Sequence, residues 1–197
     1  MILRNFLFLI IVMGLGGCNA LYYQAMEKAG VHKRDIMVDR VKEARDTQNE
    51  AKQQFLSAME QFKIVVNFKG GDLEKEYNRL NATLQKSESK AAEVRRRIRG
   101  VEDVSDALFD EWKAELKQYS SETLRESSRQ KLDATKRKYA VLIQAMKRAE
   151  AKLEPVLVPL RDHVLFLKHN LNAKAIAGLN PSSAVQEFGR CDINKLR

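Results

Sequence analysis

The chain has 197 residues, of which 31% are charged and 7% are aromatic, with only 3 prolines and 9 glycines. This mixture is typical of long helices and argues against a compact globule. The formal net charge of +9 makes anionic partners a class to consider.

A short apolar run lies near the N-terminus, between a basic start and a cysteine. Arg4 precedes the run Phe6–Met13, which is too short to span a bilayer. The run ends in Leu15-Gly16-Gly17-Cys18, and this layout resembles a secretory signal with the lipobox of bacterial lipoproteins. In a lipobox the cysteine thiol takes a diacylglyceryl group, and small Gly16 and Gly17 let the signal peptidase reach the bond before Cys18. The alternative is an uncleaved signal anchor with a buried, inert cysteine.

Cleavage between Gly17 and Cys18 would make residues 1–17 a signal peptide and residues 18–31 a lipid anchor with its juxtamembrane segment. Two or three acyl chains, palmitate among them, hold a protein on a membrane permanently. Asn19 takes the place of the aspartate that retains lipoproteins of enterobacteria in the inner membrane, so the resemblance favours the periplasmic side of the outer membrane. Lipidation of Cys18 would leave Cys191 without an internal disulfide partner.

Aromatic residues follow the cysteine closely. Tyr22, Tyr23 and Met26 suit a lipid headgroup interface. They would equally suit the end of a helical bundle, which they would cap.

Three long runs of apolar residues repeat at steps of four and three, which is typical of coiled-coil seams. The central run continues for about six heptads. It is bounded by Gly70-Gly71-Asp72, where two glycines suit a tight reversal and Asp72 suits a helix N-cap, and Ser121 is the N-cap expected for the third helix. The seams comprise, in chain order, Met37, Val41, Ala44, Gln48, Ala51, Phe55, Ala58, Phe62 and Val65; Leu73, Tyr77, Leu80, Leu84, Ser87, Ala91, Val94, Ile98, Val101, Ser105, Leu108, Trp112, Glu115 and Tyr119; and Ser128, Leu132, Thr135, Tyr139, Leu142, Met146, Ala149 and Leu153.

The third seam slips in phase at Leu153 and then continues through Leu157, Leu160, Val164, Leu167, Leu171 and Ala175. Pro155 and Pro159 lie in this stutter, so the sequence predicts a kink or a new helix start near Pro155. Gly30-Val31 interrupts the pattern before the first seam. If residues 20–67 and 72–119 are nevertheless equal in length as helices, the fold is all-α, an elongated antiparallel three-helix coiled-coil bundle over residues 32–179. Residues 180–197 then form a loosely packed C-terminal tail.

Four stretches carry a family resemblance: YYQAMEKAGVHKRDIMVDRV from Tyr22, NFKGGDLEKEYNRLN from Asn67, VEDVSDALFDEW from Val101 and VLFLKHNLNAKAIAGL from Val164. Together they resemble an uncharacterised family of proteobacterial coiled-coil lipoproteins that is classed as a domain of unknown function. The resemblance implies a lipid-anchored, mostly helical envelope protein and supplies no catalytic residues.

No group of residues in the sequence suggests catalysis, a metal site or a cofactor. His163 and His169 fall on different faces of a helix, and His32 is remote in sequence. Neither a phosphate-binding glycine loop nor a nucleophile elbow is present in the sequence. We therefore interpret the chain as non-enzymatic.

A basic belt is expected where the middle parts of the three helices meet. It would bind an anionic polymer or lipid headgroup, and a merely solvated helix face is the alternative. Nucleic acid is not expected, because aromatic residues do not interleave with the arginines and a chain with a secretory signal does not meet the genome. The candidate anion-binding residues are Lys42, Arg45, Arg95, Arg96, Arg97 and Arg99.

An apolar patch is expected beside the first hairpin tip, since the third seam leaves Leu165 and Phe166 on another side of the helix. Cover by Phe68 or by a folded-back tail with Val185 and Phe188 is the alternative. The candidate partner-binding residues are Phe68, Leu165, Phe166 and Ile176.

These features lead to one functional interpretation. The chain is a lipid-anchored envelope protein that serves as a spacer, tether or adaptor. Its partners would be membrane lipid through acylated Cys18, and another envelope protein or a cell-wall polymer.

Overall fold

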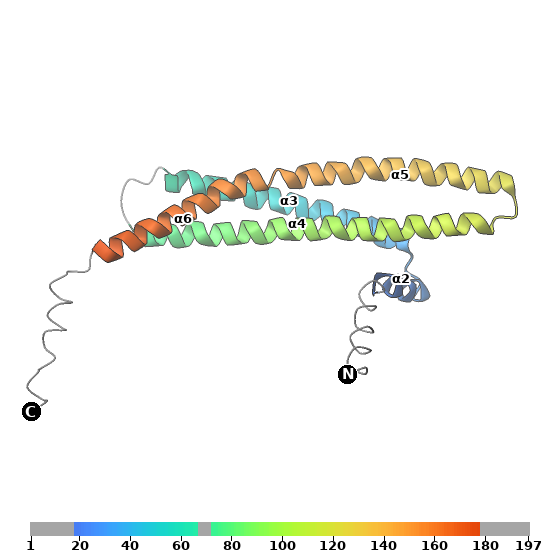
Figure 1. The fold of residues 1–197 in the computed structure, drawn as a ribbon, viewed down its shortest axis with the longest axis horizontal. Helices are drawn as coiled ribbons and strands as arrows, with labels where there is room; N and C mark the ends of the chain where they lie inside the picture. Colours follow the sequence, from blue (N-terminus) through green and yellow to red (C-terminus); the bar gives the residue numbers. More distant parts are fainter. Residues whose placement is uncertain (1–17, 67–71, 178–197) are drawn as a thin grey trace, which may run out of the picture. The chain divides into compact units, whose positions relative to one another are not determined.

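The protein is all-α in the parts that the structure describes, residues 18–66 and 72–177 of a computed structural model (Figure 1). Those residues contain no strand. The predicted signal segment 1–17, Phe68, the turn predicted at Gly70-Gly71 and the predicted tail with Cys191 lie outside the described residues. The elements are α2 (Cys18–Lys28), α3 (Lys33–Val66), α4 (Leu73–Glu115), the short 3₁₀ helix η1 (Leu116–Gln118), α5 (Glu122–Ala151) and α6 (Glu154–Ala177).

Two of the predicted helix starts are confirmed by their hydrogen bonds. The backbone N–H of Lys75 donates to the Asp72 carboxylate at 3.1 Å, and that of Leu124 donates to the Ser121 hydroxyl at 3.4 Å. Each bond satisfies a donor that has no acceptor within its own helix. Residues Asp72 and Ser121 therefore act as the N-caps of α4 and α5.

Residues 20–67 do not form one continuous helix, because the chain turns at the predicted interruption, Gly30-Val31. Gly30 has φ +82°, a conformation that favours glycine, and it ends α2. The N–H groups of Gly30 and Val31 donate to the carbonyls of Glu27 and Met26, each at 2.9 Å, which is the bonding pattern of a Schellman motif. Val31 and Met26 also pack in the same apolar cluster, so the chain makes a defined turn before α3 begins.

The expectation that the second helix runs to residue 119 is wrong, since α4 ends at Glu115 and η1 follows. The predicted third helix is interrupted at the stutter around Leu153. Here α5 ends at Ala151 and α6 begins at Glu154, with Pro155 in the first turn, where a missing N–H costs no intrahelical bond.

The chain divides into two compact units. Among the described residues, the first comprises 18–54 and 89–153. Its main apolar core draws on three helices, with Ala44 and Ala51 from α3, Val94, Ile98 and Val101 from α4, and Ile143 and Met146 from α5. Because all of these side chains except Ile143 lie at the predicted steps of four and three, the seams specify most of this core.

The described part of the second unit comprises residues 55–66, 72–88 and 154–177. Polar contacts join its helices: Thr83 of α4 donates to Gln61 of α3 at 2.5 Å, and Arg161 of α6 pairs with Glu88 of α4 at 2.6 Å. The ring of Phe62 on α3 meets His163 on α6 edge-on, with centroids 4.6 Å apart. The buried apolar side chains are Phe55, Ala58, Val65, Leu80, Leu84, Leu157, Leu160, Val164 and Leu167.

The predicted seams omit some residues that are buried and include some that are exposed. Val104, Phe109 and Ile143 are buried although the seams omit them. Ala149 and Ala175 belong to the third seam and are exposed. A helix that contacts two neighbours buries a wider stripe than a two-stranded coiled coil does, which accounts for the omitted residues.

Candidate functional site

Helix α2 is docked on the first unit through Tyr23. The Tyr23 side chain is only 2% exposed and packs with Ile36 of α3 and Val104 of α4. Arg40 Nη1 donates to the Tyr23 hydroxyl at 2.9 Å and to the Gly100 carbonyl at 2.7 Å. Burial raises the pKa of Tyr23, although Arg40 opposes the rise. Of the two roles expected for the aromatic residues, Tyr23 therefore takes the structural one, whereas Tyr22 remains 44% exposed.

A buried lysine fixes the turn between α2 and α3. Lys33 Nζ lies 2.5 Å from Glu27 of α2 and 2.8 Å from Glu111 of α4, and its side chain is 10% exposed. Burial works against its charge, but hydrogen bonds to Glu111 and Glu27 prevail and raise the pKa of Lys33. The hydrogen bond from Lys33 likewise lowers the pKa of Glu27. Sequence reasoning missed this residue, because a lysine beside a turn looks like any solvated lysine.

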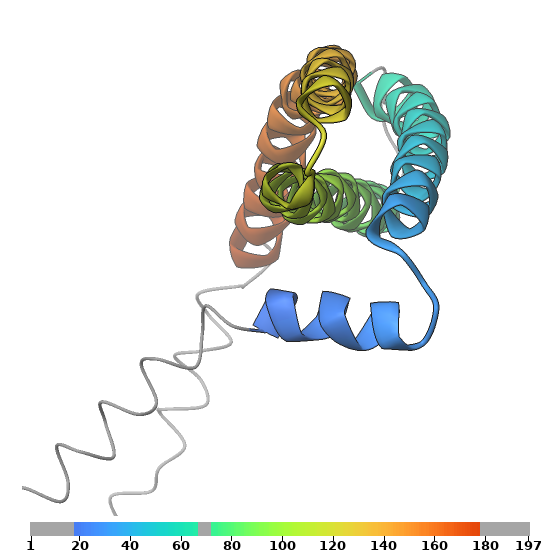
Figure 2. The ribbon, with the colours of Figure 1, turned by 90° about the vertical axis from the view of Figure 1, so that its right-hand side faces the viewer.

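The predicted lipidation site is the first residue of α2. Position 18 opens the helix, and five residues later comes buried Tyr23. A fully formed helix thus joins the candidate anchor to the first unit (Figure 2).

The predicted belt residues do not form one free basic surface. Arg97 of α4 pairs with Glu43 of α3 at 2.5 Å, and Arg95 pairs with Glu150 of α5 at 2.6 Å. Lys147 of α5 pairs with Glu102 of α4. These ion pairs link neighbouring helices, so part of the arginine cluster has a structural use that charge counting alone cannot reveal.

The remaining belt residues stay at the surface. Lys42 and Arg45 are exposed on α3, and Arg45 bonds the adjacent Asp46. Arg96 and Arg99 are exposed on α4, and neither has an ion pair among the described residues.

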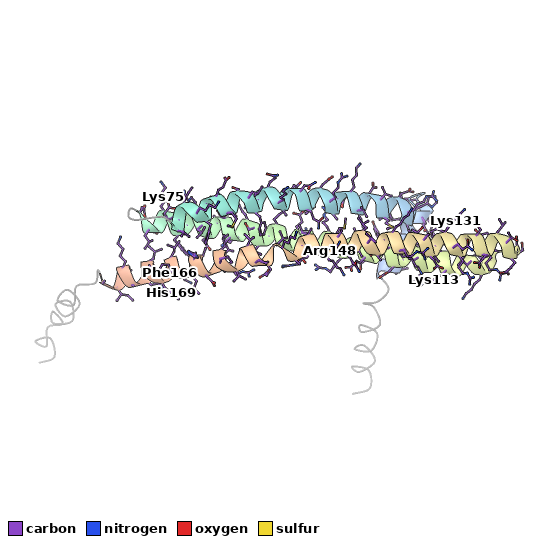
Figure 3. All side chains as sticks on the ribbon, turned by 90° about the horizontal axis from the view of Figure 1, so that it is seen from above. Lys75, Lys113, Lys131, Arg148, Phe166 and His169 are labelled. Carbon is purple, nitrogen blue, oxygen red and sulfur yellow. The ribbon has the colours of Figure 1, made fainter. Side chains whose placement is uncertain are left out.

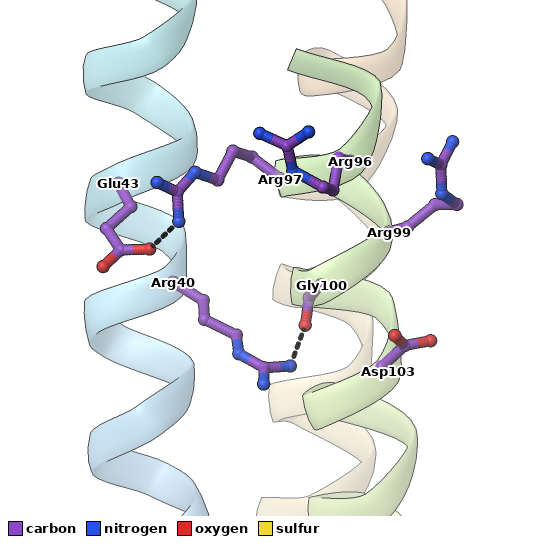
Figure 4. A pocket seen from close by; sticks show the side chains of 7 residues that line it. All are labelled: Arg40, Glu43, Arg96, Arg97, Arg99, Gly100 and Asp103. Carbon is purple, nitrogen blue, oxygen red and sulfur yellow. Dashed lines mark hydrogen bonds and ion pairs between the residues drawn. The ribbon is translucent and has the colours of Figure 1, made fainter. Parts of the chain in front are cut away.

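Two of these exposed arginines contribute to a groove between α3 and α4. It has a volume of about 330 Å³ and is lined by Arg40, Glu43, Arg96, Arg97, Arg99, Gly100 and Asp103, as Figure 4 shows. We call it the arginine groove. Its lining contains four arginines and two acidic residues, so it carries a net positive charge. Arg97 Nε is buried there without a hydrogen-bond acceptor among the described residues.

The predicted partner-binding residues that the structure describes lie on α6. Leu165 is 51% exposed, Phe166 62% and Ile176 67%; Figure 3 marks Phe166 and nearby His169. Their neighbour Leu167 is buried. Phe68 lies outside the described residues, so its place beside them stays a prediction.

Neither a metal site nor a membrane span emerges from the described residues. Within residues 18–66 and 72–177, no three His, Cys, Asp or Glu side chains gather as metal ligands would. None of the helices in those ranges combines the length and the apolar character needed to cross a membrane. His163 Nδ1 lies 3.0 Å from the Pro159 carbonyl.

A comparison with known protein families places most of the chain in a family. A family model with the description "Protein of unknown function (DUF2959)" matches residues 22–196. The comparisons with curated proteins and with solved structures found no match.

Proposed function

Since the chain belongs to the family described as "Protein of unknown function (DUF2959)", we propose a function from its own residues: it is a lipid-anchored envelope protein that acts as a non-enzymatic spacer, tether or adaptor on the periplasmic face of a membrane. The outer membrane is favoured by Asn19. The observation that carries this proposal is Cys18, which ends a lipobox-like segment and also begins a helix docked on the first unit.

The architecture that we propose for this role is an elongated, antiparallel three-helix bundle whose third helix is kinked near Pro155. Ion pairs and hydrogen bonds in the first unit support it. Three contacts join α3 to α4: Lys33 pairs with Glu111, Arg40 with the Gly100 carbonyl, and Glu43 with Arg97. Residue numbers that rise on one helix while they fall on its neighbour are expected of antiparallel helices.

The adaptor role requires a surface for an envelope partner, and we assign it to Leu165, Phe166 and Ile176. Exposed apolar residues on one helix are a common feature of protein interaction sites. Charged residues are few on this helix, and α6 has the highest mean hydropathy of the described helices.

We expect Phe166→Ser to abolish crosslinks to the envelope partner in intact cells. Its effect on melting temperature should be within about 2 °C, because substitutions at exposed positions usually change the free energy of unfolding by no more than about 0.5 kcal/mol. The matched control is Val141→Ser on α5, where the side chain is 66% exposed. It should leave both the crosslinks and the melting temperature unchanged.

Two results would count against this assignment. A large fall in melting temperature for Phe166→Ser would make Phe166 a structural residue. Crosslinks that persist in the variant would place the partner elsewhere.

The second candidate function is binding of an anionic polymer or lipid headgroup, and the arginine groove favours it. Arg40 is held in place by two hydrogen bonds, so a guanidinium group is fixed in the groove before a ligand arrives. Arg96 and Arg99 lie one turn apart on the same face of α4 and line the same groove. Such an arrangement is suited to phosphate or carboxylate groups.

The double substitution Arg96→Gln with Arg99→Gln should weaken binding of the chain from Asn19 onward to phosphatidylglycerol vesicles. Each cation near an anionic surface contributes about 1 kcal/mol, so the loss of two corresponds to about a 25-fold weaker affinity. The control is Arg137→Gln with Lys138→Gln on α5, which removes the same charge outside the groove. Sedimentation with vesicles at low and high salt measures both, and equal loss in the two double variants would show only a solvated basic surface.

A further inference from the structure

Helix α2 has one buried side and one apolar exposed side. Tyr23 and Met26 pack against α3 and α4. Leu21 is 68% exposed, the highest value among the large apolar side chains that the structure describes, and Tyr22 and Ala25 are exposed as well. The exposed apolar residues thus lie on the first turns of the helix, next to the candidate anchor.

The exposed apolar residues of α2 share one side of the helix. Positions 21, 22 and 25 follow the spacing i, i+1 and i+4, so they form one stripe along a helix. We call these three positions the α2 stripe. At 100° per residue, the centre of this stripe lies about opposite Tyr23. The stripe therefore faces away from α3 and α4, and it begins one turn after position 18, the proposed lipidation site.

The orientation of α2 is fixed by contacts at several points along the helix. Tyr23 receives the hydrogen bond from Arg40, Glu27 bonds Lys33, and the turn at Gly30 closes the helix with two backbone bonds. Lys33 also bonds Glu111. The rotation of α2 about its own axis is thereby set by the first unit.

The charge around α2 complements an anionic membrane surface. Residues 18–34 carry Lys28, Lys33 and Arg34 but only one acid, Glu27. Glu27 is neutralised by Lys33, while Lys28 and Arg34 are exposed. Cations that flank an apolar stripe with an aromatic residue are typical of helices that lie in the headgroup layer.

We infer that α2 lies flat in the headgroup layer of the membrane, with the α2 stripe inserted, and holds the first unit against the bilayer in one fixed orientation. This inference rests on the proposed lipidation of Cys18. It adds that the anchor is a rigid, docked helix and that Leu21 and Tyr22 touch lipid. Figure 2 shows α2 beside the ends of α3 and α4 that belong to its unit.

The test places a single tryptophan at position 21 of the protein that cells make from the full-length sequence. The chain has one tryptophan, Trp112, which is first replaced by phenylalanine. Leu21→Trp is then compared with Val38→Trp, whose side chain on α3 is 66% exposed. Val38 lies about 200° around α3 from Ile36, the residue that packs toward α2, so the two positions match in exposure and differ in side.

Each variant is reconstituted into vesicles of phosphatidylethanolamine and phosphatidylglycerol with brominated acyl chains. We expect Leu21→Trp to lose about half of its fluorescence, because an interfacial helix buries its apolar face at the boundary of headgroups and acyl chains. Val38→Trp should keep its fluorescence.

The possible contrary outcomes differ from one another. Protein that stays on the vesicles with unquenched Leu21→Trp would overturn the inference and leave the anchor intact. Equal quenching of both tryptophans would overturn the fixed orientation. Failure of the chain to attach to the vesicles would overturn the lipid anchor, and the inference with it.

Discussion

We expect the substitution Ile98→Asp to lower the free energy of unfolding by about 4 kcal/mol or more. Ile98 is 4% exposed and packs in the core cluster with Ala44 and Ala51 of α3 and with Ile143 and Met146 of α5. A carboxylate there loses its hydration among apolar side chains, and the packing of the isoleucine is lost as well. Urea unfolding of the chain from Asn19 onward, followed by circular dichroism, measures the change.

The matched control for this prediction is Val141→Asp on α5. Val141 is 66% exposed, so its aspartate remains hydrated and should change the free energy of unfolding by about 0.5 kcal/mol or less. Before unfolding, the spectrum of the unmodified chain should be more than about two-thirds helical, as expected for helices of this length. Similar losses in the two aspartate variants, or a strand-rich spectrum, would contradict the three-helix core.

The helical core was predictable because its signal is periodic. The spacing of four and three found Leu80, Leu84, Val94 and Ile98, all of which are buried. A residue repeat of this kind depends only on helix geometry and on the need to bury apolar surface, and both can be read along the chain.

Helix ends were predictable where local chemistry fixes them. Asp72 and Ser121 cap helices because their side chains accept bonds from nearby N–H groups. The sequence predicts an interruption at Gly30-Val31, but it does not predict the direction of α2 relative to α3. That direction depends on Tyr23, Ile36 and Val104, which only the folded chain brings together.

The electrostatic part of the site could not be predicted, because it depends on pairs that are distant in sequence. Arg97 and Arg95 belong to one run of arginines, yet they bond Glu43 and Glu150 on two different helices. Their neighbours Arg96 and Arg99 line the groove instead. The local excess of basic residues identified the segment that carries these arginines. Which of them form ion pairs and which line the groove depends on the face of α4 that each one occupies.

The second large effect is expected from Cys18→Ser. A serine hydroxyl cannot replace the thiol that forms the thioether with the diacylglyceryl group, so the variant should not be acylated. The lipid is the permanent anchor in our account, since two or three acyl chains make dissociation negligible. The variant should therefore lose stable membrane attachment as a mature chain.

The measurement that tests this claim most directly is incorporation of labelled palmitate into the full-length protein in cells, followed by fractionation. The unmodified protein should carry the label and remain in membranes washed at high salt, and Ser121→Ala should behave in the same way as a control for a change remote from the anchor. Cys18→Ser should carry no label and should not appear as a mature chain in the washed membranes. A serine variant that is processed to mature size and stays in those membranes would contradict the lipid anchor.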